Sequence, residues 1–273
     1  MTTSQSRPPN PTPTPTSIPV PSHATRASSF NAAAAQYAAN RPSYPPALLD
    51  AVEEEAGRSL TGARVVDVGA GTGISTAVLH ARGADVVAVE PGEGMAAQFR
   101  RTLPGVPLVR GNGNALPLAA DTADFLTYAQ AWHWTDPAHS VPEALRVLRP
   151  GGAIALWWNT DALDVEWIAG QNERMSRFFG VDAAAEKRKT ADRTDLADPS
   201  GRLRFARREV RWSRRIPVDT HLANLGSHSA FLVTPEDLRT SFFTDERAHL
   251  LKAFPDGVVE ETYDVLLLVA LNT

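Results

Sequence analysis

Short apolar segments alternate with amphipathic stretches between residues 63 and 159, and this pattern predicts alternating strands and helices. Apolar runs of strand length lie at 64–68, 85–90, 108–110, 125–129 and 153–159. Stretches with helical spacing lie between them, at 74–81, 93–102 and 138–148. Apolar strands joined by amphipathic helices are typical of a parallel sheet that is covered on both faces. We therefore predict an α/β fold for this part of the chain.

The segments on either side have less regular patterns. Before the alternating region, we predict helices at 30–39 and 47–56, separated by a proline-containing break at 41–46. Residues 205–216 alternate as an edge strand, with apolar side chains on one face and mostly arginines on the other. The other C-terminal elements that we predict are a helix around 167–179, a polar loop at 181–200, helices around 218–226 and 235–253, and a strand at 258–271.

Residues 1–29 differ from the rest in composition, because Pro, Ser and Thr dominate there. Prolines remove backbone donors and block helix formation, and the segment has few apolar side chains to bury. We therefore predict a disordered or polyproline-like tail. The remainder divides into a segment at 30–60, a core at 61–160, and a part at 161–273 whose last two strands complete the sheet.

Composition narrows the partners that we expect. Cysteine is absent, which excludes disulfides and thiolate metal sites, and the spacing of His221 and His228 does not suit a metal. The net charge of -4 gives no general reason to expect a nucleic-acid partner. No apolar run reaches the roughly 20 residues that span a bilayer, and no secretory signal is evident. We therefore expect a cytoplasmic protein with no metal and no membrane partner.

The first strand ends in a turn whose glycines indicate a nucleotide site. Asp67 lies near the end of the strand, and Gly69, Gly71 and Gly73 follow at alternate positions before the next helix begins. The first two glycines let the backbone approach a ligand, and the third lets the helix start tight against the strand. Glu90 ends the second strand, where a carboxylate can accept hydrogen bonds from both hydroxyls of a ribose. The structural alternatives are a simple tight turn and a solvated strand end.

Two classes of ligand fit this turn. A dinucleotide site normally has its third glycine one position later than Gly73, and a pyrophosphate prefers backbone donors without a nearby anion. Asp67 instead suits a ligand with a cationic amino group, such as S-adenosylmethionine (SAM). We expect Asp67 to act indirectly, by orienting the turn or a water molecule near that amine. The turn therefore favours SAM over a nicotinamide dinucleotide.

Motifs in four places resemble those of class I SAM-dependent methyltransferases. They lie at 67–73, at Glu90, at 111–117 and at 148–152, and they look most like the branch that includes ubiquinone-biosynthesis and trans-aconitate methyltransferases. The resemblance covers about residues 30–160. It implies a Rossmann-like three-layer sandwich with a mostly parallel seven-stranded sheet and a C-terminal antiparallel strand. It also implies SAM as the methyl donor and S-adenosylhomocysteine (SAH) as the product.

The resemblance also implies cofactor roles at matching positions. Glu90 would hold the ribose, and Pro91 and Met95 would flank the adenine, although Met95 suits a helix core equally well. Asn112 would meet the adenine edge where the family usually has Asp, its alternative being a turn residue. The cofactor-binding residues implied in this way, together with Asp67, are Tyr37, Arg41, Gly69, Ala70, Gly71, Gly73, Glu90, Pro91, Met95, Asn112, Gly113, Asn114, Gln130 and Ala131.

An N-terminal helical lid closes over SAM in the enzymes that this chain resembles, and residues 30–60 would form it. Tyr37 would contact the methionine moiety, and Arg41 would face its carboxylate. The alternative is a helix and turn that dock on the sheet without touching a ligand.

Catalysis leaves a weaker signal, because methyl transfer from a sulfonium depends mainly on positioning. His133, just after the fourth strand, is the candidate general base, and its alternative role is to pack the start of the next helix. Trp132 and Trp134 would wall an apolar pocket or shield the sulfonium. The residues that we predict on the substrate side are Tyr44, Trp132, Trp134, Trp157 and His228.

We predict an enzyme that moves a methyl group from SAM to an O, N or C atom of a small-molecule acceptor, acting as a monomer or homodimer. One alternative is an RNA or protein methyltransferase, which would explain the arginine-rich segment 202–215. Arginine outnumbers lysine 24 to 3, however, so arginine is the usual cation of this chain. The other alternative is a SAM-binding protein that catalyses a different reaction, such as a cyclisation.

Overall fold

A seven-stranded sheet forms the centre of the computed structural model, which describes residues 22–182 and 197–273. Its strand order is β3-β2-β1-β4-β5-β7-β6. Strands β1 to β5 run parallel to one another, and β7 pairs antiparallel with both β5 and β6. The predicted sheet, mostly parallel with a C-terminal antiparallel strand, is confirmed. The strands span Arg64–Val68 (β1), Asp85–Glu90 (β2), Leu108–Arg110 (β3), Ala123–Ala129 (β4), Leu148–Asp161 (β5), Ala206–Pro217 (β6) and Val258–Leu271 (β7).

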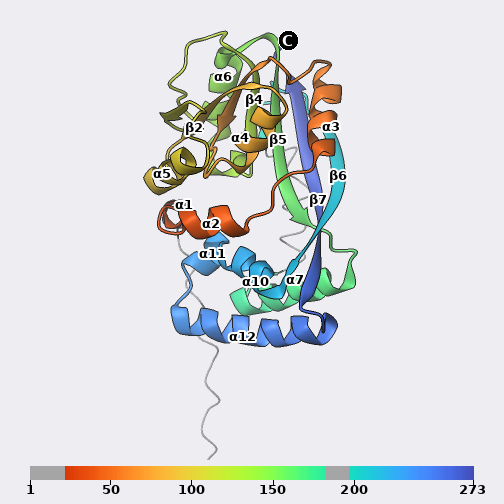
Figure 1. Cartoon of the computed structure of the whole chain (residues 1–273). Helices are drawn as coiled ribbons and strands as arrows, with labels where there is room; N and C mark the ends of the chain where they lie inside the picture. Colours follow the sequence, from red (N-terminus) through yellow and green to blue (C-terminus); the bar gives the residue numbers. More distant parts are fainter. Residues whose placement is uncertain (1–21, 183–196) are drawn as a thin grey trace, which may run out of the picture.

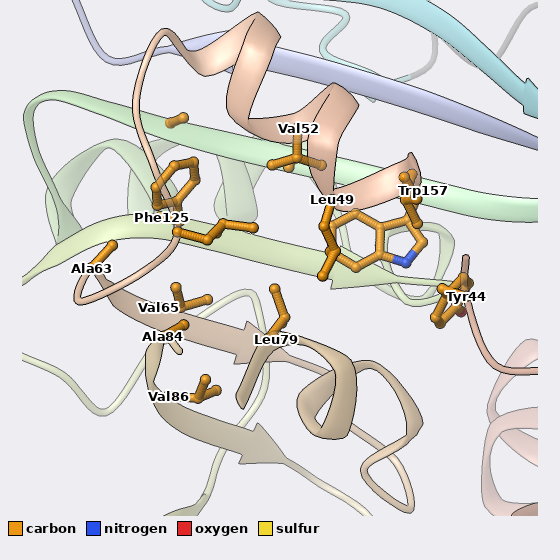
Figure 2. Packing of buried hydrophobic residues seen from close by; sticks show 14 of the residues in the cluster. Tyr44, Leu49, Val52, Ala63, Val65, Leu79, Ala84, Val86, Phe125 and Trp157 are labelled. Atoms are coloured by element: carbon orange, nitrogen blue, oxygen red, sulfur yellow. The ribbon is translucent and has the colours of Figure 1, made fainter. Parts of the chain in front are cut away.

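Helices pack against both faces of this sheet (Figure 1). On one face, Figure 2 shows Leu49 and Val52 of α3 and Leu79 of α4 gathered around the strand residues Val65 and Phe125. Helix α6 packs on the opposite face. The helices beside the sheet span Pro46–Ala56 (α3), Ile74–Ala81 (α4), Glu93–Thr102 (α5) and Pro137–Val147 (α6).

Neighbouring residues of the central strands belong to opposite faces of the sheet. Val65 and Phe125 lie in the cluster under α3 and α4, whereas Val66 and Leu126 lie in the cluster under α6. All four side chains are buried, because successive side chains of a strand point to opposite faces and helices cover both. This explains why the strands are continuous apolar runs in the sequence.

A second group of helices lies beyond the carboxyl ends of the parallel strands (Figure 1). These helices pack around a separate cluster that contains Phe178, Phe231 and Phe242. Helices α1 and α2 lie between this group and the sheet, where α1 contacts α11 and α2 contacts both α10 and α5. The helices span His23–Ser29 (α1), Ala34–Asn40 (α2), Glu166–Phe179 (α7), Val218–Gly226 (α10), Ser229–Leu232 (α11) and Glu236–Ala253 (α12).

Two expectations about the N-terminal part differ from the structure. Helix α1 lies inside the segment predicted to be disordered, where the Ser22 side chain caps it by accepting from the Thr25 N–H. Arg26 also donates to the hydroxyl of Ser229, a contact with a distant element that no local pattern reveals. Helix α2 begins at Ala34 rather than at Phe30. Residues 1–21, and 183–196 of the predicted loop, lie outside the described residues.

Strand β5 is longer than predicted, because its pairing begins before the glycine pair of segment 149–152. Leu148 pairs with Ala123 of β4, and the backbone of Gly151 and Gly152 is hydrogen-bonded to Asn272 just after β7. The expected turn at this point is therefore part of the strand. At its other end β5 continues to Asp161, which places a carboxylate beyond the edge of β4.

Candidate active site

The glycine turn joins β1 to α4 in a left-handed backbone conformation. Gly71 has φ +59° and Gly73 has φ +93°, values that residues with a Cβ rarely adopt. A Cβ on Gly73 would lie 2.7 Å from Leu103 Cδ1 and 2.9 Å from Phe99 Cδ2. A Cβ on Gly71 would meet nothing closer than 4.0 Å. Gly73 is therefore needed for packing, whereas Gly71 borders open space.

Glu90 holds the open side of this turn in place. One carboxylate oxygen accepts from the Gly71 N–H at 2.8 Å, and the other accepts from the Gly92 N–H at 2.6 Å. The side chain is buried, and burial raises the pKa of Glu90 although both hydrogen bonds oppose the rise. The carboxylate keeps further lone pairs for a ligand, because each oxygen can accept more than one hydrogen bond.

Asp67 lies beneath the turn rather than on the surface of a cavity. It is completely buried, and its two oxygens accept from the hydroxyls of Thr76 at 2.6 Å and Thr127 at 2.9 Å. Burial raises the pKa of Asp67 to about 6, although these hydrogen bonds act in the opposite direction. The carboxylate therefore links α4 and β4 behind the turn, and its indirect role in cofactor binding stays a prediction.

A cleft with a volume of about 870 Å³ opens above the turn, at the carboxyl ends of β1, β2 and β4. It brings together most of the predicted cofactor residues. Asn112, however, uses its side-chain oxygen to accept from the Asn114 N–H at 2.9 Å, so it also stabilises its own turn. The predicted residues that line this cleft are Tyr37, Arg41, Gly69, Gly71, Glu90, Pro91, Met95, Asn112, Gly113, Asn114, Gln130, Ala131, His133, Trp134 and His228.

The N-terminal segment closes one side of this cleft. The ring of Phe30 meets the edges of Tyr37 and Trp134, with centroids 5.7 and 5.9 Å apart. The side chain of Asn31 accepts from the Gly94 N–H at the start of α5. These contacts join the segment to the sheet side of the cleft, and the hydrogen bond from Arg26 joins it to α11.

Arg41 presents an unsatisfied donor at this site. Its guanidinium carbon lies 4.8 Å from the ring centroid of Tyr37, and one Nη donates to the Ser227 carbonyl at 3.4 Å. Its Nε is buried and has no hydrogen-bond partner among the described residues. A buried donor without a partner is costly, so this geometry suits an anionic ligand group.

Gln130 follows β4 in a conformation that is unusual for a residue with a side chain. Its φ is +56°, and its N–H donates to the carbonyl of Trp157 at 2.8 Å. Backbone strain of this kind clusters at functional sites, because the surrounding structure must enforce it. Gln130 borders the cleft at the point where β1 and β4 lie side by side.

The aromatic residues after β4 divide between the cleft and the core. His133 and Trp134 line the cleft, and the indole N–H of Trp158 lies 3.2 Å from His133 Nδ1. Trp132 is buried, and its indole N–H donates to the Ala197 carbonyl. Trp157 is also fully buried and packs beneath Tyr44. The expected exposure of Trp132 and Trp157 to a substrate is therefore wrong, because both fill the hydrophobic core.

A smaller cavity of about 90 Å³ continues from the cleft toward the C-terminal helices. The two cavities share Tyr37, Arg41, Gly69, Gly71 and Gln130 on their walls, and His228 also borders both. Burial lowers the pKa of His228 well below its usual range, with Arg41 and His221 as further causes, so its ring is neutral near pH 7. Of the predicted residues, Tyr44 and Ala70 line the smaller cavity but not the large cleft.

A polar network forms the far wall of the smaller cavity. Glu261 accepts from Arg214 at 2.6 Å and lies 2.6 Å from Nδ1 of His221. Gln171 links the other ring nitrogen of His221 to Glu246. Burial would raise the pKa of Glu261, but His221 and Arg214 lower it to about 2.

Sequence reasoning missed most of this wall. Asp161, Asn224, Glu261 and Tyr263 line the cavity, and none of them was selected as a site residue. A usable signal existed only for Asp161, because ligands bind beyond the carboxyl ends of the strands in open α/β sheets and Asp161 ends β5. The other three lie on elements that only the tertiary structure brings to the site.

Metal and membrane features can be assessed within the described ranges. Residues 22–182 and 197–273 contain no group of three or more His, Cys, Asp or Glu side chains arranged to hold a metal ion. Within the same ranges, every helix is too short or too polar to cross a membrane.

The glycine turn, the carboxylate at the end of β2 and the cleft above them together define a Rossmann-like protein with a site for a nucleoside-type cofactor. A family model described as "Methyltransferase domain" matches residues 66–156 of this chain. An uncharacterized methyltransferase of Mycobacterium tuberculosis is 35% identical over 227 residues, which cover 83% of this chain and 87% of that protein. The chain belongs to the class I SAM-dependent methyltransferases, and SAM is its methyl donor.

Two further comparisons describe the similarity. The demethylmenaquinone methyltransferase of Clavibacter sepedonicus is 40% identical over 101 residues, or 36% of this chain and 41% of that protein. A solved structure of a candidate type II methyltransferase from Anaeromyxobacter dehalogenans matches with a TM-score of 0.60 and 24% identity, covering 85% of this chain and 98% of that one. The similarity to this solved structure concerns the fold alone.

Proposed function

We propose that this methyltransferase acts on a small molecule whose reacting end enters the smaller cavity. The observation that carries the proposal is that the two cavities share walls: Gly71 and Gln130 border both the large cleft and an adjoining cavity of about 90 Å³. That space corresponds to about three water molecules. An acceptor atom with its immediate neighbours fits there, whereas a folded macromolecule could present only a thin protruding group.

The cofactor roles that we propose follow the walls of the large cleft. The ribose hydroxyls donate to Glu90, whose oxygens are already positioned by two backbone N–H groups. The adenine lies between Met95 and the 112–114 turn, and the methionine carboxylate pairs with Arg41, whose Nε lacks another partner among the described residues. A role for His133 as general base stays a prediction.

The arginines of β6 do not favour an RNA substrate. Arg208 pairs with Glu54 and Glu55, and Arg211 pairs with Asp164 and Asp264. Carboxylates of the same chain thus already neutralise these guanidinium groups, so little positive charge is left for phosphate binding. An edge strand with charged side chains also resists pairing with other strands.

The cofactor assignment can be tested by calorimetric titration with SAH. Glu90→Ala should weaken binding by about tenfold or more, because the buried carboxylate provides charge-assisted hydrogen bonds. Glu93→Ala is the matched control, because Glu93 is an exposed carboxylate on the first turn of α5. Equal affinity in the two variants would contradict the placement of the ribose.

The acceptor class can be tested with SAM that carries a labelled methyl group. The enzyme and labelled SAM are incubated with a metabolite extract, a total RNA fraction and a protein fraction in separate reactions. We expect label in the metabolite fraction alone. Label that enters RNA or protein, but no metabolite, would overturn the small-molecule proposal.

A further inference from the structure

Asp161 contributes a carboxylate to the smaller cavity without an ion-pair partner. It ends β5, lines the cavity and is exposed to solvent. Neighbouring protein groups displace water from it and raise the pKa of Asp161 above its usual range, although a hydrogen bond from Asn172 and the charges of His221 and Arg41 act in the opposite direction. No ion pair joins it to a cation within residues 22–182 and 197–273, where the buried carboxylates Glu246 and Glu261 have such partners.

The two neighbouring carboxylates are already neutralised. Glu261 is held by Arg214 and His221, and Glu246 pairs with Arg174 at 2.6 Å. Asp161 is therefore the carboxylate of the cavity wall without an ion-pair partner among the described residues, although Arg41 also lines the cavity. A cation placed beside it in the cavity is attracted more strongly than in bulk water, because the dielectric there is lower.

Asn224 provides a second, independent indication of what the cavity accepts. Its amide nitrogen donates to Glu261 at 3.2 Å and to the hydroxyl of Tyr263 at 3.1 Å. Glu261 can only accept, so the orientation of the amide is determined by its partners. The amide oxygen is then left as a buried acceptor without a hydrogen-bond partner among the described residues. Within the described ranges, the Asn224 oxygen thus lacks a donor, and Asp161 has a hydrogen bond from Asn172 but no ion-pair partner.

The remaining walls are aromatic. Tyr37 and Tyr44 border the cavity on the lid side, and Trp167 borders it on the helical side, where its ring contacts His221. Aromatic faces attract cations, and a cavity that combines them with an unpaired carboxylate favours an ammonium group. An anionic acceptor group would instead face the carboxylate of Asp161.

We propose that the cavity beside Asp161 is the acceptor subsite of this methyltransferase and that it binds a primary or secondary ammonium group of the acceptor. The ammonium pairs with Asp161, and its further N–H groups are available to the oxygen of Asn224. A protonated nitrogen has no lone pair with which to attack the methyl carbon, so the ammonium anchors the acceptor and a different acceptor atom receives the methyl group. The inference rests on the proposed function, because it takes the cavity as the place where the acceptor meets the methyl donor. The rest of the acceptor extends into the large cleft.

The test uses the full-length protein saturated with SAH and three probes of equal size: propylammonium, propanol and propionate. Their affinities are compared by ligand-observed NMR titration for the wild type and for Asp161→Asn. Asp164→Asn is the matched control, because Asp164 is an exposed carboxylate three residues away that pairs with Arg211. Asp161→Ala is a second variant, and thermal unfolding shows whether each variant is folded.

We expect propylammonium to bind the wild type at least about tenfold more tightly than propanol, a preference of roughly 1.4 kcal/mol. Both Asp161 variants should lose that preference, and Asp164→Asn should keep it. SAH affinity should stay within about twofold of the wild type in all variants.

Three results would overturn the proposal. The first is that propanol or propionate binds as tightly as propylammonium, and the second is that the preference survives in the folded Asp161 variants. Weaker SAH binding by Asp161→Asn would assign the cavity to the amino group of the cofactor instead. Failure of the wild type to bind SAH is a different outcome, because it would refute the cofactor assignment itself.

Discussion

Replacing single glycines of the β1–α4 turn should separate the contribution of the turn to folding from its contribution to cofactor binding. Gly71 and Gly73 both adopt positive φ, so alanine at either position costs about 1–2 kcal/mol of stability from the backbone alone. At Gly73 the added Cβ also meets Phe99 and Leu103 within 3 Å. Overpacking of this kind adds about 1–3 kcal/mol.

The structure contains a matched control for the backbone cost. Gly57 caps α3 with φ +63°, close to the +59° of Gly71, and a Cβ on Gly57 would meet nothing within 4 Å. It lines neither of the two cavities. Gly57→Ala and Gly71→Ala should therefore lose similar stability, whereas Gly73→Ala should lose about 2–5 kcal/mol in total.

Cofactor binding should follow a different order. A methyl group on Gly71 projects into space that both cavities share, so Gly71→Ala should weaken SAH binding by about tenfold or more relative to Gly57→Ala. Urea unfolding measures the stability change, and calorimetric titration measures SAH affinity. The reasoning fails if Gly71→Ala binds SAH as tightly as Gly57→Ala, or if Gly73→Ala is no less stable than Gly71→Ala.

Three further predictions concern the groups around the cleft. The folded-state pKa of Asp67 is raised from 3.8 to about 6, so the folded protein binds this proton more tightly than the unfolded chain does. The stability of the wild type relative to Asp67→Asn should therefore fall by roughly 3 kcal/mol as the pH rises from about 4 to 7. Urea unfolding at several pH values measures this difference, and a difference that does not change with pH would contradict the prediction. Arg41→Ala should weaken SAH binding by about tenfold or more, and Arg41→Lys should restore only part of it; unchanged affinity would exclude the carboxylate contact. Phe30→Ala should accelerate SAH dissociation in stopped-flow measurements, because it removes both edge contacts between lid and cleft; an unchanged rate would mean that the segment does not retain the ligand.

The sheet and the cofactor half of the site could be predicted because their signals are local. Each buried strand is a continuous apolar run, and the positions of Gly71 and Glu90 follow from the ends of two adjacent strands. The pairing of β1 with β2 in parallel register brings these ends together, so the Gly71 N–H reaches Glu90 across 19 positions of sequence. Helix α1 was missed because its stability includes the contact of Arg26 with Ser229, 203 positions away.

The error over Trp132 and Trp157 has a different cause. Both tryptophans follow or lie on central strands, where the sequence cannot decide between a cavity wall and a core position. Trp157 of β5 belongs to the cluster shown in Figure 2, whereas its neighbour Trp158 belongs to the cluster on the opposite face of the sheet. The alternation of faces assigns one to each layer but does not show which layer a ligand reaches.

The walls of the smaller cavity depend on side-chain pairs between distant segments, so they could not be predicted from local sequence patterns. Glu261 meets Arg214 across 47 positions and His221 across 40, and Gln171 meets Glu246 across 75. These pairs neutralise Glu261 and Glu246, and they leave Asp161 as the carboxylate of the wall without an ion-pair partner among the described residues. Local motifs thus specify the cofactor site of this chain, whereas the proposed acceptor site depends on which charge the pairs between distant segments leave without a partner. In this chain that charge is negative, and it lies at the end of β5.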